Sequence, residues 1–232
     1  MEDPRDIYSS MKCVWPENNR WYDYTHNYII SFIAKNLTSY LTEESIYLNA
    51  GSGGSVYDLQ GICHHVDIVE NLINKFENYT VASIETLPFK DNSFDATICV
   101  GSVLNYCDAV CSIKELSRVT RHGGYFILEF ERSNTGELCF TSEYGKNTTK
   151  QQYDYMGHIH TLWLYSETLI TTLLKECGFS VIKKERFHCI SSLANRITHN
   201  EEKSGRWAKI DRLAKPFSYL LAHNIIFFCK KL

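Results

Sequence analysis

The stretch Tyr47-Leu-Asn-Ala-Gly-Ser-Gly-Gly-Ser, residues 47–55, decides the fold that this sequence predicts. Its first half continues a strand-like run that starts at Ser45, and its second half is a glycine-rich turn. Glycine lets a chain turn sharply and lets the backbone approach a ligand closely. We expect a short helix to follow through Val56 and Leu59, so that its first N–H groups face the turn.

An acidic residue follows this turn at the sequence separation expected in nucleotide-binding folds. Asp67 stands sixteen residues after Gly51, near the end of the next apolar run. In βαβ nucleotide-binding folds, an acid at that place accepts hydrogen bonds from ribose hydroxyls. Dinucleotides and S-adenosylmethionine share this pattern. The dinucleotide fingerprint GxGxxG requires glycine at position 56, where the chain has Val56, so a nicotinamide dehydrogenase is the less favoured alternative.

Strand-like and helix-like segments alternate along most of the chain, which predicts βαβ units and a parallel sheet. The apolar spacing indicates a helix from Tyr28 to Leu41, and Asp108 is the expected N-cap of a helix that ends at residues 121–124. Ser166 is the expected N-cap of another helix, which Gly178 stops. Strands are expected at 45–50, 65–69, 79–84, 93–100, 125–130, 179–187 and 224–229.

The expected fold is therefore α/β, Rossmann-like and doubly wound. Its sheet has seven mostly parallel strands, with an antiparallel C-terminal strand. We expect one domain over residues 1–232, a common size for a single domain. Its parts would be an N-terminal cap and helix, a cofactor-binding core, an inserted lid, and C-terminal helices and strands, at residues 1–44, 45–131, 132–165 and 166–232.

Two further stretches carry a family resemblance. Residues 85–106 read Glu-Thr-Leu-Pro-Phe-Lys-Asp-Asn-Ser-Phe-Asp-Ala-Thr-Ile-Cys-Val-Gly-Ser-Val-Leu-Asn-Tyr, and residues 115–128 read Glu-Leu-Ser-Arg-Val-Thr-Arg-His-Gly-Gly-Tyr-Phe-Ile-Leu. Both resemble class I S-adenosylmethionine-dependent methyltransferases of the UbiE/methyltransferase-11 group. The late helix that ends in Gly178-Phe179 resembles the same group, so the resemblance covers roughly residues 25–188.

The resemblance implies a site for S-adenosylmethionine as cofactor. Gly51, Ser52 and Gly53 would pass under its methionine part, and Asp67 would hold the ribose hydroxyls. Ile68, Ser83, Ile84 and Glu85 would surround the adenine, while Val100 and Gly101 would offer backbone groups to the methionine amine. Asn49 begins the glycine motif, and Tyr28, with Trp21 and Tyr22, would cap the cofactor.

Three positions depart from the common family pattern. Asn49 replaces an acid, Ser55 replaces a glycine, and Ser83 replaces an aspartate. Each change removes a polar contact without removing the pocket. The main hypothesis is methyl transfer, by in-line displacement, to an O, N or C nucleophile of a small molecule. The alternative is a catalytically degenerate member that binds the cofactor or a partner without turnover.

Catalysis by this chemistry needs positioning more than a dedicated triad, because the leaving group is a neutral thioether. A base matters only when the nucleophile carries a proton that it holds tightly. The candidates are His158 and His160, at the end of the insertion, and Asn105, which stands where many relatives of the resembled family carry histidine. Glu129 and Glu131, near the end of a strand, could orient a cationic substrate.

Composition limits the partners. Lys and Arg number 24 against 27 for Asp and Glu, so the formal net charge is −3 and no nucleic acid or membrane partner is expected. Nine scattered cysteines suit reduced core positions, and Cys63-His64-His65 lacks metal-ligand spacing, so no metal is expected. The acidic start of the chain is unlike a signal peptide. We expect a cytoplasmic protein, with a homodimer as one option among oligomeric states that the sequence leaves open.

Overall fold

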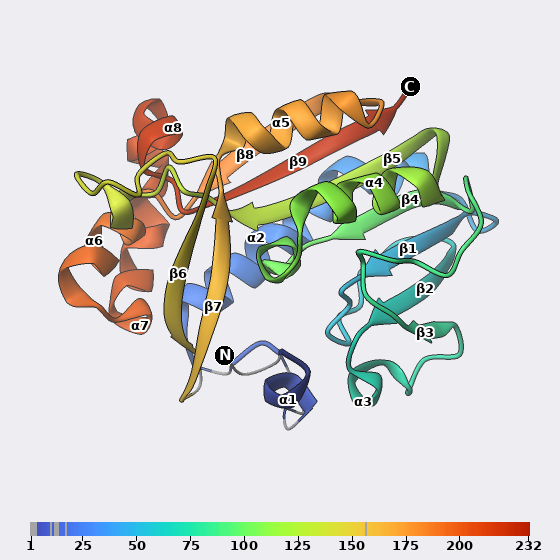
Figure 1. Cartoon of the computed structure of the whole chain (residues 1–232), viewed down its shortest axis with the longest axis horizontal. Helices are drawn as coiled ribbons and strands as arrows, with labels where there is room; N and C mark the ends of the chain where they lie inside the picture. Colours follow the sequence, from blue (N-terminus) through green and yellow to red (C-terminus); the bar gives the residue numbers. More distant parts are fainter. Residues whose placement is uncertain (1–3, 10, 12–13, 17, 156) are drawn as a thin grey trace.

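The computed structural model describes residues 4–9, 11, 14–16, 18–155 and 157–232, and it is organised around a seven-stranded sheet (Figure 1). The strand order is β3-β2-β1-β4-β5-β9-β8. Strand β9 runs antiparallel to both of its neighbours, and the other neighbouring pairs are parallel, which confirms the predicted fold class. The strands are β1 (Ile46–Ala50), β2 (Ile62–Asp67), β3 (Tyr79–Val81), β4 (Phe94–Cys99), β5 (Thr120–Glu131), β8 (Phe179–Phe187) and β9 (Asn224–Lys231).

Helices cover both faces of this sheet. Helices α4 (Ala109–Val119) and α5 (Glu167–Glu176) lie on the face toward the viewer in Figure 1, and α2 (Arg20–Leu37) lies behind. Side chains alternate along a strand, so Leu48 packs in the cluster on the α4 and α5 side while Tyr47 packs in the cluster on the α2 side. Because both faces are buried, the central strands read as continuous apolar runs.

Local sequence explains where the longer helices start. The side chain of Asp108 accepts a hydrogen bond from the backbone N–H of Cys111, and Ser166 does the same for Leu169, so both predicted N-caps are confirmed. The predicted end of α4 is wrong, because the helix stops at Val119 and β5 begins at once. Gly124 serves close strand packing instead, since a Cβ there would lie 2.8 Å from the carbonyl oxygen of Asp95.

The short helix expected after the glycine turn does not form, and the chain runs irregularly from Ser55 to Gly61. Tyr57 is buried in the cluster that contains Tyr47 and the core face of α2. This contact with residues distant in the sequence holds the segment in an irregular conformation, where local spacing alone favoured a helix. The next helix, α3 (Glu70–Ile73), is a single turn.

The insertion expected at residues 132–165 contains regular structure. After η3 (Gly136–Leu138), strands β6 (Thr148–Tyr155) and β7 (His158–Tyr165) pair as an antiparallel hairpin that projects away from the main sheet toward α1 (Figure 1). The polar composition reflects a two-stranded ribbon that is covered only in part. His158 and His160 therefore lie on a strand and not in a loop before a helix.

The remaining elements lie outside the main sheet. Helix α1 (Pro4–Ser9) lies between the hairpin and α3 (Figure 1). The connection between β8 and β9 is helical and gathers at the end of the sheet beside the hairpin. The other short elements are η1 (Thr38–Tyr40), η2 (Val103–Tyr106), α6 (Ile190–Thr198), α7 (Glu201–Gly205), η4 (Arg206–Phe217) and α8 (Ser218–Leu221).

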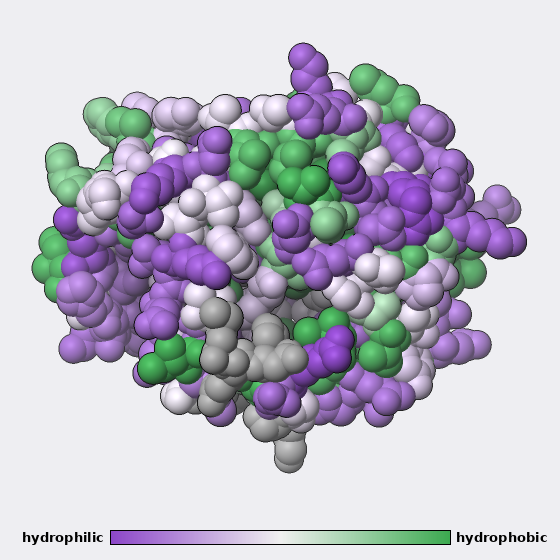
Figure 2. Space-filling view, viewed as in Figure 1, coloured by the Kyte–Doolittle hydropathy of each residue, from purple (hydrophilic) through white to green (hydrophobic). Residues whose placement is uncertain are grey.

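Hydrophilic residues cover much of the face in Figure 2, and hydrophobic residues lie there in separate patches. Within the described residues, no helix has the length and apolar character needed to cross a bilayer.

Candidate functional site

A cavity of about 460 Å³ lies beside the ends of β1, β2 and β4, where the polypeptide leaves each strand. This volume falls within the range that small-molecule sites usually have, and the carboxyl edge of such a sheet is their usual place. The cavity continues past the end of β5 to residues of the hairpin, α7 and β9. Of the predicted site residues, those that line it are Gly51, Ser52, Gly53, Asp67, Ile68, Ser83, Ile84, Glu85, Val100, Gly101 and His160.

The glycine turn forms the floor of the cavity. Gly51 and Gly53 adopt φ angles of +70° and +53°, a left-handed conformation that side chains strongly disfavour. A Cβ on Gly51 would come within 2.3 Å of a Val103 methyl carbon. Asn49 does not line the cavity, because its buried amide donates to Ser52 Oγ and to the Ser55 carbonyl. It holds the turn in shape from beneath.

Asp67 joins the turn to the end of β2. Its two carboxylate oxygens accept the backbone N–H groups of Gly53, at 2.7 Å, and of Val69, at 3.0 Å. Burial raises the pKa of Asp67, and these N–H donors oppose only part of the rise. Each oxygen still has a second lone pair, so the carboxylate can accept ribose hydroxyls as well.

An apolar slot lies beside Asp67 and suits a flat ring. The residues that line this slot are Ile68, Leu72, Ala82 and Ile84. The hydroxyl of Ser83 accepts the backbone N–H of Glu85, and the Glu85 carboxylate accepts the backbone N–H of Asp108. These contacts keep both polar side chains at the edge of the slot.

The segment after β4 is shaped by a buried acid. Glu129 is fully buried, and its Oε2 accepts the backbone N–H groups of Gly101, at 2.8 Å, and Ser102, at 2.9 Å. Burial raises the pKa of Glu129 to about 7, although its hydrogen bonds oppose the rise. Glu129 therefore positions the Gly101 backbone and is not exposed to a substrate.

The N-terminal residues form an aromatic wall that the sequence indicated only in part. The Tyr8 hydroxyl lies 2.9 Å from the Tyr106 hydroxyl, which lies 2.8 Å from Nδ1 of His160. Trp15 donates from its indole nitrogen to Ser55 Oγ at 3.2 Å. These contacts join α1, η2, β7 and the glycine turn around one cavity.

Tyr28 does not reach the cavity, so its predicted role as a cap is wrong. Its hydroxyl donates to Glu185 at 2.7 Å, and its ring stacks on Phe187 with centroids 4.4 Å apart. It follows Tyr22 by six residues on α2, which is roughly 9 Å along a helix axis. Trp21 and Tyr22, one to two turns earlier, do line the cavity.

Two of the three catalytic candidates are also placed elsewhere. Asn105 is fully buried, and its amide donates to the carbonyls of Glu131 and Trp163 and accepts the N–H of Glu131. It ties η2 to β5 and β7, and the backbone uses its polar atoms. His158 pairs with Tyr155 at the far end of the hairpin and does not line the cavity, whereas His160 does.

The far end of the cavity contains residues that sequence reasoning missed, together with Tyr22, which it placed over the cofactor, and Glu131, which it considered for a cationic substrate. Tyr22, Glu131, Tyr153, Glu201 and Asn224 line it, from five different elements. The only signals in the sequence were the aromatic N-terminus and the acids at the end of β5. Nothing local marked Glu201 or Asn224, because only the folded chain brings α7 and the start of β9 to this edge.

Comparison with known proteins agrees with this geometry. A family model described as "Methyltransferase domain" matches residues 48–128, which run from β1 into β5. This part of the chain is therefore similar to a methyltransferase domain. The match favours this class over the dehydrogenase alternative.

Within that class, the core is similar to the ubiquinone/menaquinone biosynthesis C-methyltransferase UbiE. It is 34% identical to UbiE of Rickettsia bellii over 125 residues and 35% identical to UbiE of Rickettsia felis over 127 residues. Each alignment covers 47% of this chain and 50% of the relative. The chain thus spans about half the length of the curated relatives that it matches.

Solved structures share the fold over nearly the whole chain at low sequence identity. The PH0226 protein of Pyrococcus horikoshii superposes with a TM-score of 0.60 at 14% identity, covering 99% of this chain and 100% of that one. A Burkholderia thailandensis 1,6-didemethyltoxoflavin-N1-methyltransferase, solved with that compound and S-adenosylhomocysteine, gives 0.58 at 12% identity, covering 97% and 84%. The shared fold extends beyond the region that the family model matches.

Proposed function

We propose that this protein transfers a methyl group from S-adenosylmethionine to a small-molecule acceptor. The observation that supports this most is one cavity with two chemically different ends. One end has the glycine turn, Asp67 and an apolar slot, and the other has tyrosines and carboxylates. A nucleotide-like cofactor and a separate acceptor could meet between them.

The residues present fit the proposed cofactor. Gly51 and Gly53 leave the floor open because they have no Cβ, and Asp67 retains lone pairs for ribose hydroxyls. Ile68 and Ile84 would sandwich the adenine, and the backbone near Gly101 would face the methionine part. When bound, S-adenosylmethionine supplies a methyl group whose transfer breaks a carbon–sulfur bond and leaves a neutral thioether.

In the proposed reaction, the protein's own residues position the acceptor and take up the proton that the acceptor releases. The walls from α1 and the hairpin would limit the access of water. His160 is 3% exposed, and its Nδ1 shares a hydrogen bond with the Tyr106 hydroxyl. This pair is the proposed route for a proton that leaves the acceptor, while Asn105 acts only as a structural tie. In-line geometry remains part of the proposal.

The departures at Asn49, Ser55 and Ser83 leave the cavity open. Asn49 and Ser55 make contacts that support the turn, and Ser83 orients the chain beside the adenine slot. These three departures therefore do not favour the alternative of binding without turnover. That alternative depends on whether the acceptor end of the cavity binds a substrate. We also propose, from the sequence, that residues 1–232 form a single domain and that the protein is cytoplasmic, with a homodimer as one option.

Calorimetric titration of the full chain with S-adenosylhomocysteine tests the cofactor assignment directly. We expect saturable binding with one site per chain. Methyl transfer would then be measured with labelled S-adenosylmethionine and a panel of small acceptors. Absence of any binding would refute the proposal, and binding without transfer to any acceptor would support the non-catalytic alternative.

A further inference from the structure

We propose that the acceptor carries a basic amine, held as an ammonium group at the end of the cavity lined by Glu131, Glu201 and Asn224. This inference rests on the proposed function and specifies its substrate class. The UbiE relatives are named as C-methyltransferases and the Burkholderia thailandensis protein as an N1-methyltransferase, so these names do not agree on the acceptor atom. The argument comes from three features of this end of the cavity.

The first feature is a buried acceptor atom without a donor. Asn224 is 2% exposed and lines the cavity, and its Nδ2 donates to Glu129 Oε1 at 2.7 Å. This contact orients the amide, and among the described residues no hydrogen-bond donor reaches its Oδ1. A buried acceptor left in this state costs about 1–3 kcal/mol. A ligand N–H at this point would remove the cost.

The second feature is a carboxylate beside that amide. Glu131 and Asn224 are directly opposite each other on β5 and β9, so their side chains project from the same face of the sheet. Oε2 of Glu131 lies 3.3 Å from Nε2 of His223, and this ion pair is the contact that the described residues offer it. The two adjacent strand ends therefore present a carboxylate and an amide oxygen together.

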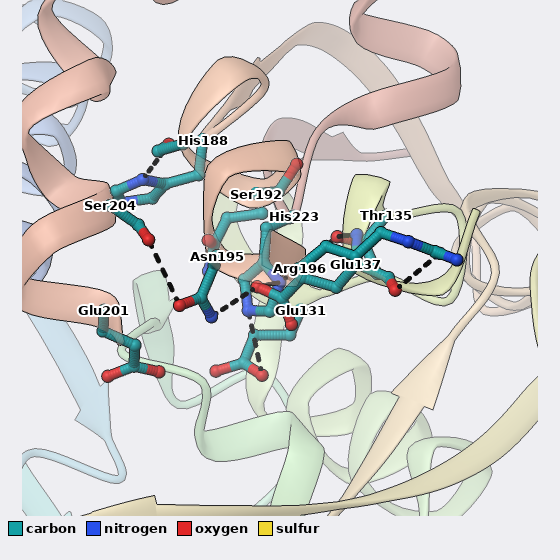
Figure 3. A network of polar contacts seen from close by, with 12 residues as sticks. Glu131, Thr135, Glu137, His188, Ser192, Asn195, Arg196, Glu201, Ser204 and His223 are labelled. Carbon is teal, nitrogen blue, oxygen red and sulfur yellow. Dashed lines mark hydrogen bonds and ion pairs between the residues drawn. The ribbon is translucent and has the colours of Figure 1, made fainter. Parts of the chain in front are cut away.

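The third feature is an excess of negative charge. His223 lies between Glu131 and Glu137, 3.3 Å from an oxygen of each, as Figure 3 shows. Burial lowers the pKa of His223, but the two carboxylates outweigh burial and raise it to about 9. One imidazolium thus faces two carboxylates, and Glu201 adds a third acid nearby, to the left in Figure 3.

Among the described residues, no lysine, arginine or histidine forms an ion pair with Glu201. Its Oε2 accepts the Tyr22 hydroxyl at 2.5 Å, and burial raises its pKa to about 7, with Glu137 and Glu131 adding to the rise. The neighbouring arginines are directed elsewhere: Arg196 donates to the carbonyls of Glu137 and Cys139, and Arg20 pairs with Glu202. An incoming ammonium would stabilise the charged form of this carboxylate.

The surrounding walls also suit a cation. The rings of Tyr22, Tyr106 and Tyr153 line this end, and aromatic faces attract ammonium groups. Among the described residues that line the cavity, the arginine is Arg5. It lies toward the adenine end, because it also borders a depression formed with Ile68 and Asn71. An anionic acceptor would meet the two acids that line this end, Glu131 and Glu201, and a quinone would offer no donor to Asn224 or Glu131.

The test is calorimetry on the protein saturated with S-adenosylhomocysteine, using matched sets of probes. Each set contains a small primary or secondary amine, the alcohol of the same shape and the carboxylate of the same shape, for example tyramine, tyrosol and 4-hydroxyphenylacetate. We expect at least one amine to bind at least tenfold more tightly than its alcohol, with no binding of the carboxylates. Equal or tighter binding of alcohols or carboxylates, or binding of no amine across the panel, overturns the inference.

Variants locate the site. Glu131→Gln and Glu201→Gln should each weaken the amine at least tenfold while the affinity for S-adenosylhomocysteine is unchanged. Glu202→Gln is the matched control, because Glu202 is the next residue of α7 and pairs with Arg20 on the surface. Equal loss in the control, or no loss in either test variant, contradicts the assignment. Failure of S-adenosylhomocysteine to bind wild-type protein would instead refute the proposed function, so the two failures are distinguishable.

Discussion

At the scale of single residues, Asp67 serves both the glycine turn and the proposed ribose site. Its carboxylate accepts two backbone N–H groups, so part of its role is structural. Asp67→Ala should weaken binding of S-adenosylhomocysteine by about 1–3 kcal/mol, the usual cost of losing a hydrogen bond to a charged group. Calorimetry would measure the affinity.

The matched control for this variant is Asp58→Ala, which removes an exposed carboxylate on the irregular segment after the glycine turn. Its affinity should equal that of the wild type. If Asp67→Ala binds as tightly as the control does, Asp67 does not hold the ribose.

Glu201 gives a prediction for pH. Its ordinary pKa of 4.5 is raised to about 7 by burial, so the folded protein holds this proton more tightly than the unfolded chain does. The resulting stabilisation is complete below about pH 4.5 and is lost as the pH rises through about 7. The melting temperature of wild-type protein relative to Glu201→Gln should therefore fall between pH 5 and pH 8.

Scanning calorimetry of both proteins at several pH values would measure this difference. Glu129 titrates in both proteins, so its contribution cancels. A difference that stays constant, or that grows with pH, would contradict a raised pKa for Glu201.

At the scale of elements, the glycine turn combines two constraints that substitution can separate. Gly51→Ala places a Cβ at a φ of +70° and within 2.3 Å of Val103. Gly123→Ala meets a similar φ of +75° but nothing within 4 Å. The strained backbone alone should cost about 1–2 kcal/mol in both variants, so any further loss at Gly51 reports the clash.

Chemical denaturation would measure the free energy of unfolding of both variants, and calorimetry their affinity for S-adenosylhomocysteine. We expect Gly51→Ala to be the less stable and to bind more weakly, while Gly123→Ala binds normally. Equal stability with normal binding in both would show that the turn adjusts without affecting the cavity.

At the scale of the whole molecule, ligand binding should stabilise the fold that surrounds the cavity. A ligand at one hundred times its dissociation constant adds about 2.7 kcal/mol when only the folded state binds it. For a chain of this size, that corresponds to a rise of roughly 5 to 10 °C in melting temperature. S-adenosylhomocysteine should produce this rise in wild-type protein, as measured by scanning calorimetry.

The same concentration should produce a much smaller rise in Asp67→Ala, because the ligand would then be closer to its dissociation constant. Adenosine monophosphate at equal concentration is a control that lacks the methionine part. A wild-type melting temperature that does not respond to S-adenosylhomocysteine would argue against the proposed site.

The local sequence by itself determined the alternation of strands and helices, the glycine turn and the place of Asp67. Each depends on short-range patterns, in which apolar spacing, glycine and caps such as Asp108 and Ser166 act within a few residues. Two predictions from local sequence were wrong: a helix through the segment that contains Tyr57, and the end of α4. At both places, contacts with distant strands outweigh the local preference.

Only the tertiary structure decided what forms the acceptor end of the cavity. Tyr22, Glu131, Tyr153, Glu201 and Asn224 come from a helix, the main sheet, the hairpin and the long C-terminal connection. No period or spacing links them, because their proximity follows from the order of strands and the path of the crossovers. Tyr28 was misplaced for the same reason, since the sequence shows an aromatic residue on a helix but not which turn of that helix faces the cavity.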